Sequence, residues 1–237
     1  EVERRDADFH NVAERASSSP TSSFSTRLNA SVALERMLPQ SLGLAVPVSV
    51  TYANSNSLPK YIPGKDVETS VLSGADLDKV RAINEQRGFT ISARRRVTSK
   101  NWLLRYTLDN LSASLSNTEN HSTNSTTLFA DRTTWAGNMN YTLAFGRNNF
   151  VSPLWFMKGL PLLGKIGGTK LYFTPQNFDM KFQNNVSSSK SENRVTTGTG
   201  LRTNLRTDLL SRDFHFNYKL LEPLTLDWSR GYTYDLR

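Results

Sequence analysis

Alternation between apolar and polar side chains is the feature that most constrains the fold of this chain. Within residues 24–34, every second side chain, starting with Phe24, Thr26 and Leu28, is apolar or tolerates lipid, and the intervening ones are mostly small or polar. Side chains of a β-strand point alternately to opposite faces, so this pattern predicts a strand with one apolar and one polar face. The same alternation recurs in four further segments, 46–52, 135–145, 178–182 and 214–220.

Strand length and aromatic placement indicate a membrane. A transmembrane strand needs about 9–11 tilted residues, and the alternating runs carry aromatic residues near their ends. We therefore expect an all-β fold, an antiparallel transmembrane β-barrel wall of about eight strands that is a segment of a much larger barrel, with a short helix in one long loop. No stretch approaches the roughly 18 apolar residues of a membrane helix. The mean hydropathy of −0.48 does not oppose a barrel, because half of each strand faces a polar lumen.

Composition narrows the function classes further. The chain has no cysteine, which excludes disulfides, zinc–thiolate sites and thiol nucleophiles. Its formal net charge is +8, but the basic residues are scattered and only Arg94, Arg95 and Arg96 are clustered. In a barrel such residues line the lumen or lie at the headgroup level, and we expect no nucleic-acid partner.

The expected organisation is one partial barrel domain over 1–237, with a long loop at 55–88 and an apolar connection at 148–169. A short helix is expected within 73–88, with Ser73 as N-cap and Gly88 as stop. The apolar connection is expected to pack a helical turn against the barrel end. The expected strands cover about 22–38, 44–54, 89–97, 110–117, 133–147, 170–185, 213–221, and residues from 224 onward.

The connections give an expected orientation. The tight turns at 39–43 and 222–223 are the first and seventh connections, so both lie at one end of an up-and-down sheet. Outer-membrane barrels keep short turns on the periplasmic side, and the second, fourth and sixth connections are long or polar. The N-terminus has no signal-peptide core and the C-terminus stops within an alternating run, so we expect a fragment of a longer barrel.

Because side chains alternate along a strand, odd and even positions of each expected strand belong to opposite faces, one toward lipid and one toward the lumen. Seven aromatic residues are candidates for interfacial belts: Tyr52, Tyr141, Phe145, Phe173, Phe178, Tyr218 and Trp228. Six residues are expected to face the lumen: Arg27, Asn29, Asn138, Asn140, Lys181 and Asn217. Ten residues are expected to face lipid: Leu28, Val32, Val48, Val50, Met139, Leu143, Met180, Phe182, Phe216 and Leu226.

No catalytic, cofactor-binding or metal-binding residues are expected, and we interpret the chain as a non-enzyme. The segment 159–166 resembles a P-loop, but Ile166 replaces the hydroxyl residue that would ligate magnesium. The histidines His10, His121 and His215 are far apart, with no carboxylate or second histidine at ligand spacing in the sequence.

Several phrases along the chain, in the same order, resemble the SprA (Sov) family, the outer-membrane translocon of the type IX secretion system, which is also tied to gliding motility. No single phrase is diagnostic, and the ordered set is what carries the resemblance. The phrases are residues 6–11, 38–49, 59–63, 108–114, 151–154, 173–178 and 213–218.

The resemblance implies a segment of a very large single-chain barrel in the outer membrane, whose pore passes folded proteins to the cell surface. It also implies partners: membrane lipids, secreted cargo proteins, a smaller outer-membrane shuttle barrel, a periplasmic plug and other periplasmic proteins. Two other interpretations remain open. One is another outer-membrane barrel, of the lipopolysaccharide-assembly or nutrient-uptake type, and the other is a soluble glycan-binding β-sandwich.

Overall fold

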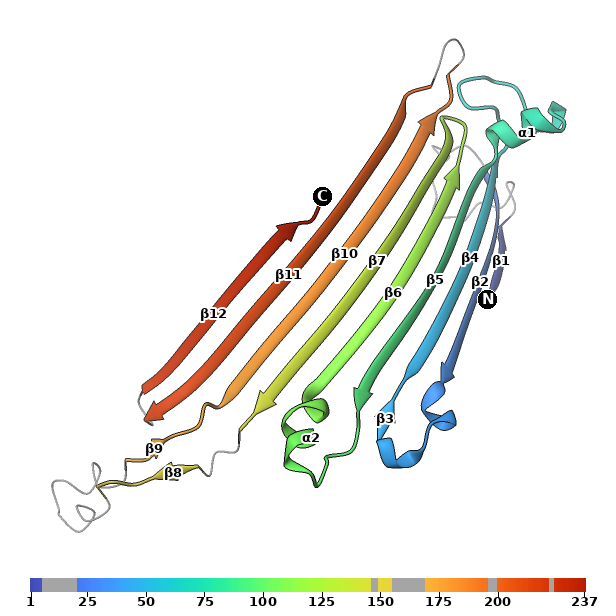
Figure 1. Ribbon diagram of the computed structural model, residues 1–237. Helices are drawn as coiled ribbons and strands as arrows, with labels where there is room; N and C mark the ends of the chain where they lie inside the picture. The colour runs from blue at the N-terminus through green and yellow to red at the C-terminus, as the bar shows by residue number, and fades with distance from the viewer. Residues whose placement is uncertain (6–20, 146–148, 155–168, 196–199, 222–223) are drawn as a thin grey trace, which may run out of the picture.

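The computed structural model describes residues 1–5, 21–145, 149–154, 169–195, 200–221 and 224–237. Within these residues the chain is all-β, as the alternation predicted, and forms a single twelve-stranded sheet (Figure 1). All the strand pairs are antiparallel. The sheet is open: β1 lies at one edge and β12 at the other, so the two termini are far apart (Figure 1).

Eight long strands form the body of the sheet, with lengths between 12 residues in β12 and 20 residues in β11. Most strands of globular proteins have about 3–10 residues, so these are unusually long. They are β2 (Thr21–Ala33), β4 (Pro47–Pro59), β5 (Ala82–Arg95), β6 (Leu111–Thr123), β7 (Thr127–Ala144), β10 (Asn177–Asn193), β11 (Arg202–Leu221) and β12 (Leu224–Asp235). The four short strands are β1 (Val2–Arg5), β3 (Leu44–Ala45), β8 (Phe150–Val151) and β9 (Leu171–Tyr172).

Helical segments occur only in the connections of the described residues. Two short α-helices, α1 (Ala75–Val80) and α2 (Trp102–Tyr106), lie at opposite ends of the sheet, which we call the α1 end and the α2 end (Figure 1). The single-turn 3-10 helices are η1 (Leu34–Met37), η2 (Gln40–Leu42), η3 (Thr69–Val71) and η4 (Leu108–Asn110).

The expected helix within 73–88 and the expected loop at 55–88 are both too long. Helix α1 ends at Val80, its N-cap is Gly74 rather than Ser73, and no side chain caps it. Strand β5 begins at Ala82 and is paired on both sides, with β4 and with β6. Gly88 lies inside this strand, where an added Cβ would be 3.0 Å from the carbonyl oxygen of Asn117. Close packing between neighbouring strands, rather than the end of a helix, therefore explains this glycine.

Residues 118–132, left as a polar connection between two expected strands, are mostly strand. β6 continues to Thr123 and β7 begins at Thr127. The side-chain oxygen of Asn124 accepts hydrogen bonds from the backbone N–H groups of Thr126 and Thr127, which closes a tight turn. Likewise, β10 and β11 extend through much of the Ser/Thr/Asn tract at 186–204.

The expected division between short turns at one end and long loops at the other is therefore wrong. The turn at residues 124–126 lies at the α1 end, where a long loop was expected. The connection from β7 to β10, residues 145–176, lies at the α2 end and is the longest between consecutive long strands. Its residues 155–168, which include the P-loop-like segment and the expected helical turn, lie outside the described part of the chain. In the described part, β8 pairs with β9.

At the α2 end, two connections are held together by a group of contacts that we call the turn cluster: Glu35, Leu42, Gly43, Arg95, Arg96, Ser99 and Asp109. Arg95 donates from Nε to the carbonyl oxygen of Leu42 at 3.0 Å and pairs through Nη1 with Asp109 at 2.8 Å. The side chains of this ion pair are only 13% and 8% exposed. Arg96 pairs with Glu35 at 3.3 Å, and its backbone N–H donates to the carbonyl oxygen of Gly43 at 2.8 Å.

Gly43→Ala should destabilise the turn cluster. Gly43 has a φ of 58° and caps η2, and an added Cβ would lie 2.9 Å from the Cβ of Val97. The left-handed conformation alone costs a non-glycine residue about 1–2 kcal/mol, and the contact with Val97 adds to it. The thermal unfolding midpoint should therefore fall. The matched control is Gly64→Ala, with a φ of 77° and no neighbour within 4 Å, which should lower the midpoint less. Equal effects would contradict the role of Val97.

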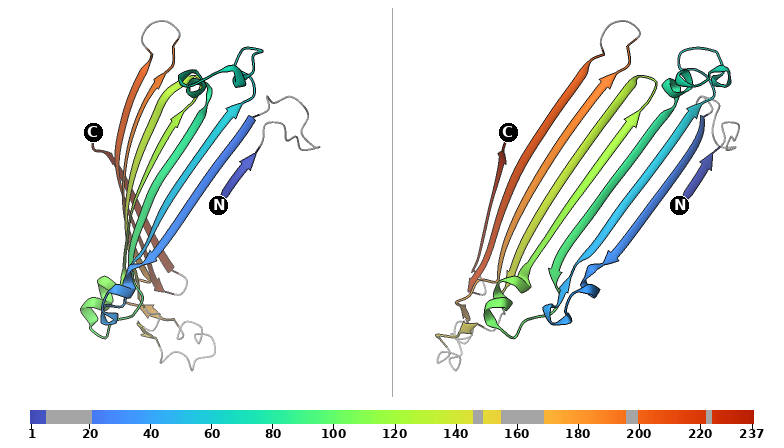
Figure 2. Two further views of the ribbon diagram at one scale, coloured as in Figure 1. Left: turned by 90° about the vertical axis from the view of Figure 1, so that its right-hand side faces the viewer. Right: turned by 45° about the vertical axis from the view of Figure 1, so that its right-hand side comes forward.

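No conventional hydrophobic core exists in the described residues. Ala45 is their only fully buried apolar residue, and the chain exposes 17055 Å². A globular monomer of 26.7 kDa exposes about 10,700 Å² by surface–mass scaling. Figure 2 shows the described residues edge-on and obliquely, and no second layer of strands or helices covers either face of the sheet. The described residues therefore leave the apolar side chains of the sheet uncovered.

Candidate functional site

The strand register sorts the side chains into two faces, because residues paired across neighbouring strands lie on the same face. One row runs through Val32, Val48, Ile91, Leu115 and Gly137 and continues on β10 and β11. We call the face that contains this row the banded face, because its apolar side chains form a continuous band across the long strands. The opposite face, which alternates with it along every strand, is the polar face.

The register separates the two sets of residues as the sequence predicted. The ten residues expected to face lipid all lie on the banded face, and the six expected to face a lumen all lie on the polar face. The members of the apolar band are Leu28, Ala30 and Val32 on β2; Val48, Val50 and Tyr52 on β4; Phe89, Ile91 and Ala93 on β5; Leu111, Ala113 and Leu115 on β6; Trp135, Gly137, Met139, Tyr141 and Leu143 on β7; Phe178, Met180 and Phe182 on β10; Phe214, Phe216 and Tyr218 on β11; and Leu224, Leu226 and Trp228 on β12.

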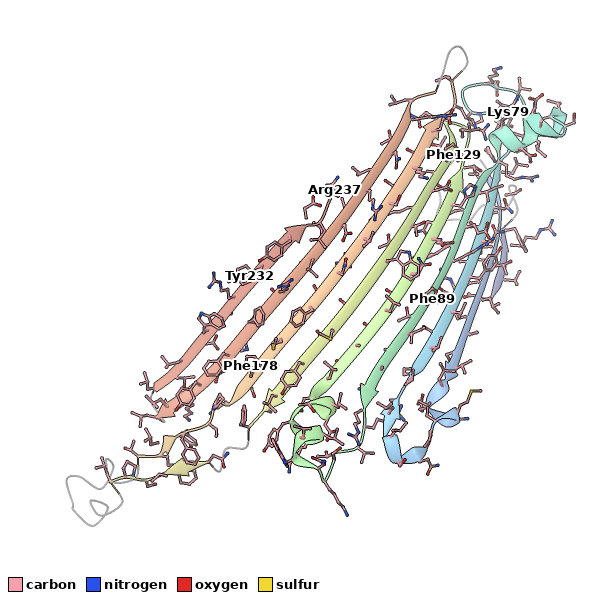
Figure 3. All side chains as sticks on the ribbon, viewed as in Figure 1. Lys79, Phe89, Phe129, Phe178, Tyr232 and Arg237 are labelled. Atoms are coloured by element: carbon pink, nitrogen blue, oxygen red, sulfur yellow. The ribbon has the colours of Figure 1, made fainter. Side chains whose placement is uncertain are left out.

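Aromatic side chains lie toward the limits of the band. Phe178 on β10 lies at the limit of the band toward the α2 end (Figure 3), and so does Tyr218 on β11. At the other limit, Phe89 and Trp135 make an edge-on contact with ring centroids 5.7 Å apart. Asn117 lies on the strand between them and is only 6% exposed, so the two rings cover it. Of the expected belt residues, Phe145 and Phe173 fall beyond the strand ends.

Beyond the band, toward the α1 end, the banded face becomes charged. Arg87 donates to Glu85 at 2.6 Å, and His121 pairs with Asp131 across β6 and β7. Further along, Arg202 pairs with Glu192 at 2.8 Å. The banded face is thus apolar over only part of its length, which divides it into an apolar zone and a water-compatible zone.

The polar face carries hydroxyl and amide side chains over its whole length. The rows of β6, β7 and β10 contain, for example, Ser114, Asn138 and Gln183, which face Ser92 and Ser211 on the next strands. The Nδ2 of Asn138 donates to the hydroxyl of Ser114 at 3.5 Å. Such a face suits contact with water and forms no apolar core.

The polar face also contains a charged group that sequence spacing missed. His215 lies between two carboxylates, with Nδ1 3.3 Å from Asp179 and Nε2 3.2 Å from Asp227. Asn217 donates to the same oxygen of Asp227 at 3.0 Å. Spacing in the sequence gave no carboxylate partner for His121 or His215, because their partners come from adjacent strands. Only the strand register could have shown them. His10 lies outside the described residues.

The arginine cluster at 94–96 is divided among different roles. Arg95 and Arg96 belong to the turn cluster through Asp109 and Glu35. Arg94 is directly opposite Ala45 on β3 and Ser112 on β6, and it lies on the polar face. Two of the three arginines therefore stabilise turns, which the sequence did not predict.

Asp109 should make the turn cluster sensitive to acid. The backbone N–H of Ser99 and the Arg95 guanidinium lower the pKa of Asp109 below its ordinary value, which is about 3.9 in the unfolded chain. The ionised carboxylate therefore stabilises the folded turns above about pH 4, and this contribution is lost as the pH falls through the lowered pKa. At pH 7, Asp109→Asn should speed hydrogen exchange in residues 96–110, and the difference from the wild type should shrink toward pH 3. Asp66→Asn, at an exposed loop position, is the control. A difference that stays constant with pH would contradict this role.

Within the described ranges, no cluster of three or more histidine, aspartate or glutamate side chains could hold a metal ion. No helix in that part of the chain has the length and apolar character needed to cross a membrane. No protein-family model matches the chain, and no curated protein matches it either.

Proposed function

We propose that this chain is part of the wall of a large transmembrane β-barrel in an outer membrane, with the apolar band facing lipid and the polar face lining the lumen. The observation that carries the proposal is the uncovered apolar band on one face of a single sheet whose other face is polar. In a soluble β-sandwich, a second sheet would lie about 10 Å above the apolar face. None covers it in the described residues, and lipid is the solvent that such a band fits.

The inclination of the band to the strands supports the proposal. The band on β2 is centred on Ala30. A row of directly paired residues that starts at Ala30 crosses six strand-to-strand steps and ends at Asp208 on β11. The band on β11 is centred on Phe216, which is eight residues further along that strand. From β2 to β11 the band therefore shifts by about 26 Å along the strands, at about 3.3 Å per residue, while it crosses about 29 Å of sheet, at about 4.8 Å per strand. A level band then requires strands tilted by about 42°, within the range of about 35–45° in transmembrane barrels.

The height of the band agrees with a bilayer. On β7 the band extends from Trp135 to Leu143, which is about 26 Å along the strand and about 20 Å along the normal of a level band at this tilt. The apolar belts of outer-membrane barrels are about 25 Å tall. Glu85, six residues from the band centre at Ile91, then lies about 15 Å along the normal and outside the hydrocarbon, and Arg87 lies close to its limit.

We further propose that the barrel is a protein-conducting translocon of the type IX secretion type. The support is the ordered resemblance to the SprA (Sov) family together with the character of the polar face. Small hydroxyl and amide side chains present no apolar groove, so the hydrophilic surface of a folded cargo protein can pass without being held. Secreted proteins, a smaller shuttle barrel, a periplasmic plug and other periplasmic proteins are the partners proposed with this function. No catalysis is proposed.

Single cysteines along β7 of the full-length protein test which face meets lipid. Residues 1–237 contain no cysteine, and any cysteine outside them is replaced first. A polarity-sensitive fluorophore at Gly137 or Met139 should be quenched by a lipid-soluble quencher, whereas one at Asn138 or Asn140 should be quenched from water. These residues alternate between the two faces. Quenching that does not alternate would overturn the membrane orientation.

The protein-conducting role needs a separate test in the full-length protein. Its partners should be recovered by detergent extraction and mass spectrometry, and depletion of the protein should trap cargo in the periplasm. Recovery of lipopolysaccharide-transport proteins, or loss of nutrient uptake with normal secretion, would favour the other barrel class.

A further inference from the structure

Two arginines and two tyrosines form a compact group on the banded face of β11 and β12. Arg212 lies opposite Tyr232, and Arg230 lies opposite Phe214 of the apolar band. The guanidinium of Arg230 lies 4.7 Å from the ring centre of Tyr232, and that of Arg212 lies 5.6 Å from the ring centre of Tyr234. The two rings are stacked, with centroids 6.3 Å apart and an interplanar angle of 10°. We call these four residues the Arg–Tyr group (Tyr232 is labelled in Figure 3).

Both arginines of the group are exposed and lack an acidic partner. No carboxylate lies within ion-pair distance of Arg212 or Arg230 among the described residues, in contrast to Arg87 and Arg202, which are paired on the same face. Asp208 is the next carboxylate along β11 on this face, and Asp213 and Asp227 point to the polar face. Stacking on tyrosine holds a guanidinium plane while leaving its N–H donors available at the edge.

The group lies at the limit of the apolar band. Arg230 is the next residue on the banded face after Trp228, and Arg212 is paired with Phe182. Arg212 is four residues from Phe216, the centre of the band on β11, which is about 10 Å along the normal at the tilt derived above. The hydrocarbon belt is about 25 Å tall, so its edge lies about 12.5 Å from the band centre. The long side chain of Arg212 can therefore reach the headgroup level. Tyrosines are also enriched at this depth.

We propose that Arg212 and Arg230, oriented by Tyr232 and Tyr234, bind the phosphate groups of anionic lipid headgroups. The inference rests on the proposed membrane orientation and adds a lipid-recognition site to it. A guanidinium matches phosphate oxygens through paired N–H donors, and the ligand is then a lipid because the group adjoins the lipid-facing band. A free phosphate would gain nothing from that band.

The test uses the full-length protein in nanodiscs of phosphatidylcholine, alone or mixed with phosphatidylglycerol or with lipid A, and measures retained anionic lipid by mass spectrometry. Each arginine near a membrane surface contributes about 1 kcal/mol to the binding of anionic lipid. The double variant Arg212→Gln/Arg230→Gln should therefore bind anionic lipid with an affinity lower by a factor on the order of thirty. Retention of phosphatidylcholine should not change. The matched control is Arg27→Gln/Arg132→Gln, which removes the same charge from exposed positions on the polar face and should retain anionic lipid like the wild type.

Three outcomes would overturn the proposal: unchanged retention in the double variant, an equal loss in the polar-face control, or complete displacement of the lipid by equimolar inorganic phosphate. The single variants Arg212→Gln and Arg230→Gln should each give part of the loss, which keeps the test valid if the double variant assembles poorly. The cysteine probes on β7 test the membrane orientation separately from the headgroup site. If those probes report lipid while the double variant retains anionic lipid, only the headgroup site is wrong.

Discussion

Val48→Arg and Val50→Arg should strongly reduce assembly of the protein into the membrane, whereas Ser49→Arg should assemble nearly as well as the wild type. The three residues are consecutive on β4, yet the valines lie on the banded face and Ser49 lies on the polar face, paired with Ser31 and Thr90. A charged side chain on the lipid face costs about 2–4 kcal/mol at the midplane of the bilayer, whereas lumen positions tolerate it.

Assembly is measured as the fraction of protein whose electrophoretic mobility changes on heating and which resists protease in membranes. Val48→Leu is the conservative control for the altered volume and should assemble normally. Equal tolerance of arginine at all three positions would contradict lipid contact on the banded face and would favour a soluble protein in which another protein surface covers the band.

Residues 1–237 expressed alone should not form a closed, pore-forming barrel. In the described residues β12 pairs with no strand other than β11, and β1 pairs with only residues 23–26 of β2. The remainder of the β2 edge, which includes Leu28 and Val32 of the apolar band, has a neighbour on one side alone. Each backbone N–H or C=O group left unpaired in hydrocarbon costs several kcal/mol, so neither edge can face lipid.

The expected result for the isolated chain is therefore a product that is digested by protease and shows no heat-dependent change in mobility. The same strands within the full-length protein, analysed in parallel, should resist protease, since the large-barrel proposal has further strands pairing with both edges. A stable pore made from residues 1–237 alone would contradict the large-barrel proposal and favour a small, self-contained barrel.

Where one face of a strand is apolar, local sequence identified the strand and its faces. Alternation around Val48, Met139 and Phe182 placed each of these residues on the banded face, and the register agrees. The period of two is a local property, since each side chain's direction depends only on its position along its own strand. The all-β fold followed from the same pattern.

Strand ends and loops were predicted poorly where both faces are polar. Residues 118–123 of β6 and 202–212 of β11 carry polar or charged side chains on both faces, apart from Leu205, Leu209 and Leu210, and lay outside the expected strands. They are strands because their backbone groups pair with strands that are already in place, such as β5 and β10. Residues 82–88 were expected to be the end of a helix because Ser73 resembles a helix start and Gly88 a helix stop, and pairing on both sides makes them strand.

What the sequence by itself determined was thus the all-β class, the alternation and the membership of the two faces, because these depend on the spacing of side chains within one strand. The tertiary structure alone decided the lengths of the strands, the carboxylates on either side of His215, the division of Arg94, Arg95 and Arg96 among separate contacts, and the inclination of the band. Each of these depends on the register between strands that are distant in sequence. Matching of the apolar faces of neighbouring strands and the geometry of the turns set that register, so it cannot be read from one strand alone.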